Sequence, residues 1–292
     1  MELINNHIRG VILAIIGFGI FSMTDALSRI FAHEGYSVFQ IVMTVQWIGL
    51  AVLLCFSRKL GGLQATLASK NKKLHFMRAI CVCVSVPANV YAFSVLPFAL
   101  TYTLLFTGAF WLVLFSGIMT REVMNLEKIY AIIIGMIGAI IVLRPWADAF
   151  DWRMLIPIVS AILYGVQSLM ARRMGGQETP LSLAFYTMLM MAILTTLWVV
   201  MRGDFIMPDM TIAPLFVMSG IMVGIATLCL PLAFRYAPAN IVGPIHYTQL
   251  IWAAFVGFFL FHETPDVPTI VGGTIIMCAG LWTILAARRK SR

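Results

Sequence analysis

Two opposite charges, Asp25 and Arg29, lie within an apolar stretch that covers residues 8–30. Because they are four residues apart, they share one face if this stretch is a helix. Ionisable side chains inside such a stretch are costly to bury and by default indicate a functional site. Two interpretations are open. Either the two side chains neutralise each other near a helix end, or Asp25 binds a cationic group or a proton while Arg29 binds a carboxylate.

A second polar group lies in the C-terminal half, in the apolar stretch of residues 239–261. His246 and Gln249 are three residues apart and share a helical face, while Tyr247 turns partly away. Histidine titrates near neutral pH, so His246 joins Asp25 as a candidate for carrying a proton. A hydrogen bond between helices is the alternative role for His246.

Aromatic and amide side chains in other apolar stretches would complete a binding pocket. Ring faces stack on planar molecules and attract cations, although packing in the core is an alternative role for each ring. The candidate substrate-binding residues are Asp25, Arg29, Gln46, Tyr91, Tyr102, Phe106, Trp111, Tyr164, Gln167, Tyr186, His246, Tyr247 and Gln249. We expect no catalytic residue, metal site or cofactor, and the five cysteines are scattered in apolar stretches as core residues.

The composition tells what surrounds these residues. Of the 292 residues, 61% are hydrophobic and 11% are charged, whereas a soluble domain has about 45–50% apolar and about 25% charged residues. A folded chain cannot hide that much apolar surface from water. The composition therefore excludes a soluble enzyme, a disordered chain and a nucleic-acid-binding domain, and it indicates that lipid is the solvent.

The apolar residues are gathered in ten runs, each close to the roughly 20 residues that one spanning helix needs. The runs are long and continuous, whereas the strands of a membrane barrel alternate, so we expect an all-α membrane protein of ten transmembrane helices. Proline separates the runs at residues 96–98 and 236–238. The runs cover residues 8–30, 36–57, 75–96, 99–120, 127–144, 153–171, 180–201, 211–234, 239–261 and 268–287.

The positive charges predict the orientation. With ten spans and a cytoplasmic N-terminus, 16 of the 20 lysines and arginines fall on the cytoplasmic side. An excess of basic residues in cytoplasmic loops sets the orientation of membrane proteins. We therefore expect both termini in the cytoplasm and the chain in the bilayer, with a bacterial inner membrane as its location. The formal charge of +8 reflects topology rather than a nucleic-acid partner.

Weak internal repetition divides the chain into halves. At an offset of 142 residues Asp25 aligns with Gln167, and at an offset of 141 Glu122 aligns with Glu263. The predicted halves are residues 1–145 and 146–292, with five helices each. Since five is odd, the second half enters the membrane from the opposite side. Such inverted repeats place a substrate site between the halves, near the middle of the membrane.

Two segments resemble the second part of an EamA repeat, and with them the chain resembles the drug/metabolite transporter superfamily over its whole length. The first segment runs Leu104-Leu105-Phe106-Thr107-Gly108-Ala109-Phe110-Trp111 and continues through Thr120-Arg121-Glu122 to Gly135 and Gly138. The second contains Tyr247-Thr248-Gln249-Leu250, Phe261-His262-Glu263-Thr264-Pro265-Asp266, Gly272, Gly273 and Gly280. One departure is that EamA repeats often carry a proline within the fourth helix of each half, where this chain has Ala109 and Leu250.

Two shorter motifs suggest a branch of that superfamily. Residues Thr24-Asp25-Ala26-Leu27-Ser28-Arg29 and Pro244-Ile245-His246-Tyr247-Thr248-Gln249-Leu250 resemble the branch that contains S-adenosylmethionine and riboflavin transporters. The resemblance implies a central cavity surrounded by helices 1–4 and 6–9, with helices 5 and 10 packed outside. Glycines in helices 5 and 10 would allow close helix packing. We expect Glu122 and Glu263 to anchor loops and cap helices, and Arg78 either to reach the membrane interface or to form part of a cytoplasmic gate.

The sequence thus predicts a secondary transporter that moves a small polar or amphipathic metabolite by alternating access. Walker loops and hydrolase motifs are missing from the sequence, which leaves proton coupling, exchange or facilitated diffusion. Two alternatives are a non-transporting membrane receptor or scaffold and an intramembrane enzyme. The expected partners are a small-molecule metabolite and the lipid bilayer, without nucleic acid, and the chain is expected to be a monomer or a homodimer.

Overall fold

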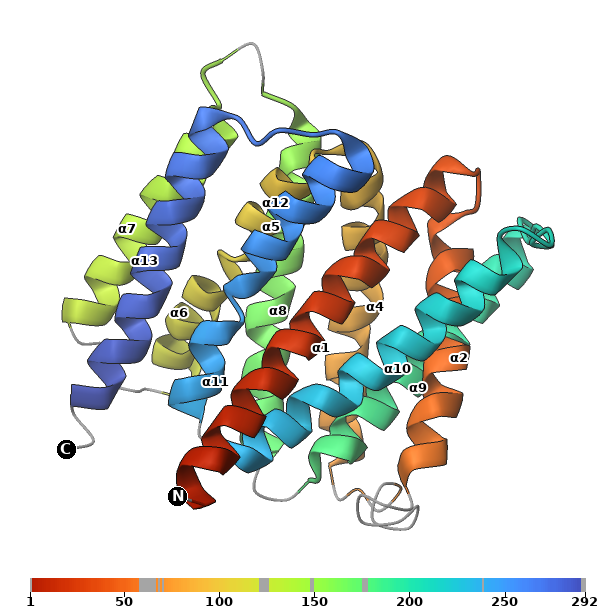
Figure 1. The fold of residues 1–292 in the computed structure, drawn as a ribbon, viewed down its shortest axis with the longest axis horizontal. Helices are drawn as coiled ribbons and strands as arrows, with labels where there is room; N and C mark the ends of the chain where they lie inside the picture. Colours follow the sequence, from red (N-terminus) through yellow and green to blue (C-terminus); the bar gives the residue numbers. More distant parts are fainter. Residues whose placement is uncertain are drawn as a thin grey trace.

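The structure, a computed structural model, is a bundle of helices (Figure 1). It describes residues 2–57, 67, 69, 71–120, 126–147, 150–174, 178–237 and 239–289. The helices are α1 (Glu2–His33), α2 (Val38–Ser57), α4 (Lys72–Val95), α5 (Phe98–Leu105), α6 (Gly108–Thr120), α7 (Leu126–Leu143), the short 3₁₀-helix η2 (Trp152–Met154), α8 (Leu155–Met174), α9 (Pro180–Arg202), α10 (Ala213–Tyr236), α11 (Ala239–Ile245), α12 (Thr248–Phe261) and α13 (Val267–Arg289). Glu122 and six of the 20 basic residues used for the orientation lie outside the described residues.

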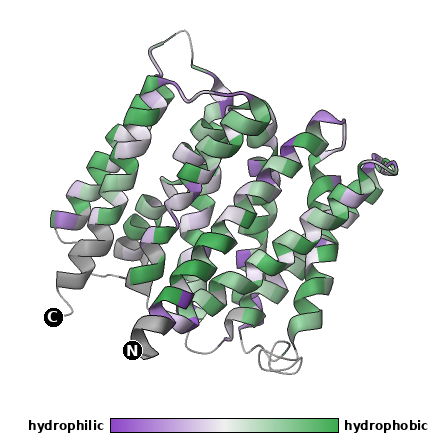
Figure 2. Cartoon of the chain, in the orientation of Figure 1, coloured by the Kyte–Doolittle hydropathy of each residue, from purple (hydrophilic) through white to green (hydrophobic). Residues whose placement is uncertain are grey.

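Within the described residues, seven helical segments are long and apolar enough to cross a membrane, and one of them, Phe98–Ser116, runs through both α5 and α6. Three further apolar helices, over Ile129–Leu143, Thr248–Phe261 and Val267–Trp282, are shorter. Large apolar side chains are exposed along the outer surfaces of the bundle, among them Ile133, Val200 and Phe259. Figure 2 shows the same pattern, with hydrophobic residues over most of the helices and hydrophilic ones gathered at helix ends and connections. This surface suits lipid rather than water, so the chain is an integral membrane protein.

Prolines end helices where the sequence predicted. Helix α4 ends at Val95 and α5 begins at Phe98, with Pro97 between them at φ −56°. Helix α10 ends at Tyr236 and α11 begins at Ala239. Proline lacks the N–H that would continue the preceding helix, and its fixed φ suits the start of the next one. Both predicted breaks are confirmed.

Two of the expected continuous helices are each broken near the middle, which corrects the sequence prediction for residues 99–120 and 239–261. Helices α5 and α6 meet at Phe106 and Thr107, and α11 and α12 meet at His246 and Tyr247. At both breaks the backbone makes tight three-residue turns, with the N–H of Thr107 donating to Leu104 and that of Tyr247 donating to Pro244. Tight turns inside a helical segment often mark functional hinges.

The causes of the two breaks are local. In α11, Pro244 removes one backbone donor. In α5, the Thr101 and Thr103 hydroxyls donate to carbonyl oxygens one turn earlier, at 3.0 and 2.8 Å, and such bonds bend helices. The same short bond follows each break, since the hydroxyls of Thr107 and Thr248 both donate at 2.7 Å to the carbonyl oxygen three residues earlier.

The helices pack in pairs that come from different parts of the chain. Helix α1 packs on α10, α2 on α9, α4 on α8, and α7 on α13. Helices α7 and α13 lie side by side at one edge of the bundle (Figure 1). Their approach is close because a Cβ at Gly138 would lie 2.9 Å from the carbonyl oxygen of Gly272. The predicted role of these glycines in helix packing is confirmed.

The bundle has two ends, which we name after acidic residues. At the Glu263 end, α1 and α4 end, α5 begins, and α12 is connected to α13. At the Glu178 end, α8 ends and α9 begins. Helix α1 begins and α13 ends at the Glu178 end, so the two termini of the bundle point the same way (Figure 1).

Candidate binding site

The candidate site is built around Asp25 of α1. Its carboxylate accepts a hydrogen bond from the hydroxyl of Tyr102 in α5. Tyr102 is 4% exposed, and its ring lies 5.0 Å from that of Phe93 in α4. Asp25 lies eight residues before the end of α1, about 12 Å along the helix axis. The one carboxylate that the sequence placed deep inside a span thus has a buried phenol as its partner.

Aromatic rings from the two broken segments meet beside this pair. The Phe106 ring stacks on Tyr247 with 5.1 Å between centroids and meets the edge of His246 at 5.0 Å. On its other side, His246 stacks on Phe18 of α1 at 4.7 Å. Phe106 and Tyr102 lie four residues apart, with ring centroids 6.5 Å apart. The break residues Phe106, His246 and Tyr247 therefore form one aromatic cluster with Asp25 and its partner.

Two further sequence candidates, Gln249 and Tyr164, adjoin this cluster, and a third, Trp111, packs on α8. Gln249, 7% exposed, pairs with His246 through its side chain. Tyr164 of α8 lies within electrostatic reach of Tyr247, and it is 42% exposed although it faces Gly108 across the α6–α8 contact. Trp111 packs on α8 near Gly165, and its indole N–H is buried without a hydrogen-bond partner. A donor of this kind can serve a ligand.

Arg29 lies one turn beyond Asp25, but its ionic partner comes from elsewhere. Its guanidinium contacts the Glu263 carboxylate at 2.6 Å and lies over the Phe261 ring at 4.3 Å. The other oxygen of Glu263 accepts the backbone N–H of Phe98, at the start of α5, at 2.8 Å. Glu263 thus caps α5 and anchors the connection between α12 and α13, as predicted. The alternative in which Asp25 and Arg29 neutralise each other is not what the structure shows.

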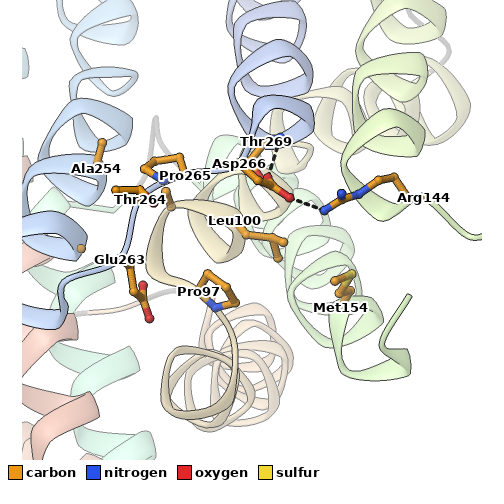
Figure 3. Close-up of a pocket in the computed structure, with 12 residues that line it drawn as sticks. Pro97, Leu100, Arg144, Met154, Ala254, Glu263, Thr264, Pro265, Asp266 and Thr269 are labelled. Atoms are coloured by element: carbon orange, nitrogen blue, oxygen red, sulfur yellow. Dashed lines mark hydrogen bonds and ion pairs between the residues drawn. The ribbon is translucent and has the colours of Figure 1, made fainter. Parts of the chain in front are cut away.

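A cavity of about 200 Å³ lies beside Glu263 at the same end. Figure 3 shows Glu263, Pro97 and Leu100 around it, with the Arg144–Asp266 ion pair on the far side. Asp266 also accepts the backbone N–H of Thr269 at 3.0 Å and so caps α13. These contacts hold the pKa of Asp266 below its ordinary value, although burial acts to raise it. The cavity leaves space next to the Glu263 carboxylate.

The other four sequence candidates are not shown in contact with this cluster. Tyr186 belongs to the Glu178 end, where its ring packs 4.6 Å from His75 and its hydroxyl donates to the Leu67 carbonyl. Gln46 of α2 is buried, and its side-chain oxygen has no hydrogen-bond partner. The remaining two, Tyr91 and Gln167, are half-buried in α4 and α8.

Sequence reasoning missed a buried polar cluster around Glu178. The Glu178 carboxylate accepts hydrogen bonds from the hydroxyls of Ser69 and Ser182, at 2.7 and 3.0 Å, and from the backbone N–H of Asn71, at 3.3 Å. His75 lies 3.5 Å away. Burial acts to raise the pKa of Glu178, but these hydrogen bonds outweigh it and lower the pKa to about 2. The sequence does contain one signal near this cluster, because a threonine before an apolar run, here Thr179, predicts the start of a helix. In the structure the Thr179 hydroxyl accepts the Ser182 N–H at 3.0 Å.

Arg78 of α4 ties this cluster to α9. One nitrogen of its guanidinium donates to the Leu183 carbonyl and the Thr187 hydroxyl, at 2.8 and 2.9 Å. Its Nε is buried without a partner, and Tyr164 lies within electrostatic reach. Arg78 therefore lies between the Glu178 end and the candidate site.

Comparison with known proteins decides the class of molecule. Residues 152–286 match the model of the EamA-like transporter family. The C-terminal half of the chain is therefore similar to this transporter family. The resemblance drawn from residues 104–138 and 247–280 and from the two shorter motifs is confirmed. The protein is a transporter rather than an enzyme.

Curated relatives match most of the chain. A riboflavin transporter of Vibrio cholerae is 26% identical over 254 residues, which is 86% of this chain and 84% of the relative. An S-adenosylmethionine uptake transporter of Rickettsia prowazekii is 22% identical over 289 residues, or 99% and 97% of the two chains. A pseudopaline exporter of Pseudomonas aeruginosa is 23% identical over 273 residues, or 92% and 94%.

The fold itself recurs in a crystal structure. One solved protein chain superimposes with a TM-score of 0.67 at 16% identity, and the match covers 99% of each chain. At that identity the likeness concerns the fold alone. It shows that another solved protein has a similar arrangement of helices along almost its whole chain.

Proposed function

We propose that this chain is an EamA-like secondary transporter that moves a small polar or amphipathic metabolite by alternating access. The observation that carries the proposal is the Asp25–Tyr102 bond beside the cluster of Phe106, His246 and Tyr247. The cluster forms where two helical segments are broken. Broken helices near the middle of the membrane are a common way to build a transporter's substrate site.

We further propose that residues 1–145 and 146–292 are two inverted repeats of five spans each. Supporting this, Phe106 and Tyr247 differ by 141 residues and stack on each other, and Thr107 and Thr248 make the same bond after each break. Equivalent helices also contact in pairs, α2 with α9 and α7 with α13. Inverted repeats allow the two halves to exchange roles, which is the basis of alternating access.

The site favours a planar, nitrogen-rich substrate. This substrate either carries a positive charge or is transported together with a proton. Asp25 would bind the cation or the proton, and the rings of Phe106 and His246 would stack on the planar part. The relatives that are named for riboflavin and S-adenosylmethionine fit this class. The direction of transport follows the gradient, and we expect a bacterial inner membrane with both termini in the cytoplasm.

Two measurements on purified protein test this function. Thermal unfolding is followed with riboflavin, S-adenosylmethionine and a wider metabolite panel, because a ligand that binds the folded state raises Tm. Compounds that raise Tm are then loaded into proteoliposomes, with and without an imposed proton gradient. Saturable flux that exceeds that of empty liposomes supports the proposal. Binding without flux for every such compound would favour a receptor.

A further inference from the structure

Asp25 and Arg29 are four residues apart on α1, and Phe98 and Tyr102 are four residues apart on α5. Tyr102 donates to Asp25. One turn closer to the Glu263 end, Glu263 joins Arg29 to the Phe98 N–H, at 2.6 and 2.8 Å. Residues at this spacing lie on one helix face. The two connections are therefore successive rungs between the same two helices.

The rungs matter because the backbones of α1 and α5 are not close neighbours. Helix α1 packs mainly on α10, α4 and α12, whereas α5 packs mainly on α12 and α8. The link between α1 and α5 thus depends on side chains. If Glu263 moved away, α1 and α5 would still be joined through Tyr102, whose hydroxyl bonds to Asp25 and has Ser22 beside it.

Glu263 is well placed to act as a releasable link. Both of its oxygens are used, one by Arg29 and the other by Phe98. Its side chain is 23% exposed and that of Arg29 is 12% exposed, so the pair lies at the edge of the interior rather than deep in it. The cavity beside Glu263 gives the carboxylate space to move (Figure 3).

We propose that Glu263 is a positioning residue for the substrate site, and that it couples the occupancy of Asp25 to the closure of the Glu263 end. The proposal rests on the proposed transport function, since it names the regulation of the same site. While Glu263 holds Arg29 and Phe98, Tyr102 is fixed against Asp25 and the end is closed. Closure needs both links. A cation or proton that binds Asp25 releases Tyr102, and the Glu263 link alone does not keep the end closed.

The test measures the closure directly and needs no substrate. Spin labels are placed at Glu34 and Thr264, which are exposed at this end, in a background without native cysteines. Their distance distribution is compared among wild type, Glu263→Gln, Arg29→Gln, Tyr102→Phe and the double variant Glu263→Gln/Tyr102→Phe. Glu263→Gln keeps an acceptor for Phe98 but lacks the charge that pairs with Arg29. The matched control is Asp266→Asn, which breaks the neighbouring Arg144 ion pair without touching α1 or α5.

We expect Glu263→Gln and Arg29→Gln to raise the population at longer distances about fivefold or more, and Asp266→Asn to leave it unchanged. The double variant should fall short of the product of the two single effects, because both rungs serve one closure. Two results would overturn the proposal: a distribution in Glu263→Gln and Arg29→Gln that matches wild type, or effects of Glu263→Gln and Tyr102→Phe that simply multiply. Absence of flux in the proteoliposome assay would instead contradict the transport function.

Discussion

Tyr102 of α5 donates a hydrogen bond from its hydroxyl to the carboxylate of Asp25 in α1. Asp25 is the acidic residue that the first helix carries in its apolar middle, and Tyr102 is buried next to the break between α5 and α6. The bond therefore connects Asp25, a carboxylate that is costly to bury, with the broken segment formed by α5 and α6. Any ligand that binds the Asp25 carboxylate must compete with the Tyr102 hydroxyl for it.

Removal of the Tyr102 hydroxyl should leave Asp25 without its partner. We expect Tyr102→Phe to lower the free energy of unfolding by about 1.5–3 kcal/mol, the range for a hydrogen bond to a charged group. Thermal unfolding in detergent measures this, with Tyr130→Phe as the control because Tyr130 is exposed on α7. Equal Tm values for the two variants would show that the bond contributes nothing to stability.

The stacked rings of Phe106 and His246 should determine the affinity for a planar ligand. We expect Phe106→Leu to weaken the binding of a planar compound by up to about tenfold, because a ring contact contributes about 0.5–1.5 kcal/mol beyond its buried area. Binding is measured by titration of the compound that raises Tm most. The control is Phe259→Leu, a ring exposed on the surface of α12. Similar affinities for both variants would place the ligand elsewhere.

Gly280 of α13 leaves room for Tyr247, since a Cβ at position 280 would overlap the Tyr247 hydroxyl. We expect Gly280→Ala to displace Tyr247 from its stack on Phe106 and to destabilise the protein by about 1–3 kcal/mol. Gly273→Ala on the same helix is the control, because its Cβ would come no closer than 3.3 Å to the Thr103 hydroxyl. The account of the stack fails if the two variants unfold at the same temperature.

Glu178 gives a prediction for the dependence of stability on pH. Its pKa in the folded protein is about 2, against an ordinary value of 4.5, because the hydrogen bonds to the carboxylate outweigh the opposing effect of burial. Folding therefore favours the charged form, so the stabilisation is complete above pH 4.5 and is lost as the pH falls towards 2. At pH 7 we expect Glu178→Gln to unfold at a lower temperature than wild type.

The difference in Tm between wild type and Glu178→Gln should narrow as the pH falls below about 4.5. Glu127→Gln, at an exposed position of α7, serves as the control and should match wild type throughout. A gap that stays constant between pH 7 and pH 3 would mean that Glu178 acts through its shape rather than its charge.

Much of this fold is predictable because lipid imposes long apolar runs. The ends of α4 and α10 can be predicted from the prolines next to them. The functional importance of Asp25 can be predicted from its position inside an apolar run. The break between α5 and α6 is not predictable in the same way. It depends on threonine hydroxyls that bond to their own helix, and the same residues stay in regular helices elsewhere, as Thr195 does.

The partners of the charged residues also escape sequence reasoning. Spacing alone favours Arg29 as the partner of Asp25, but the long arginine side chain reaches the connection between α12 and α13 and contacts Glu263. That contact joins residues near opposite ends of the chain, so local spacing holds no trace of it. The partners of Glu178 are equally hard to predict. Glu178 lies in a connection between helices, and its position in the sequence does not indicate that Ser69 and Asn71 will contact it.

The most direct test of the account is transport by Asp25→Asn. Asparagine keeps the shape of aspartate and can accept the Tyr102 hydrogen bond, but it carries no charge and takes up no proton. In proteoliposomes that contain the compound with the largest Tm increase, we predict that Asp25→Asn lowers flux about 10- to 100-fold, as for the loss of a charged partner. Asp151→Asn, in the connection before η2 with its side chain 37% exposed, should transport like wild type. Flux through Asp25→Asn equal to that of wild type would contradict the role of Asp25.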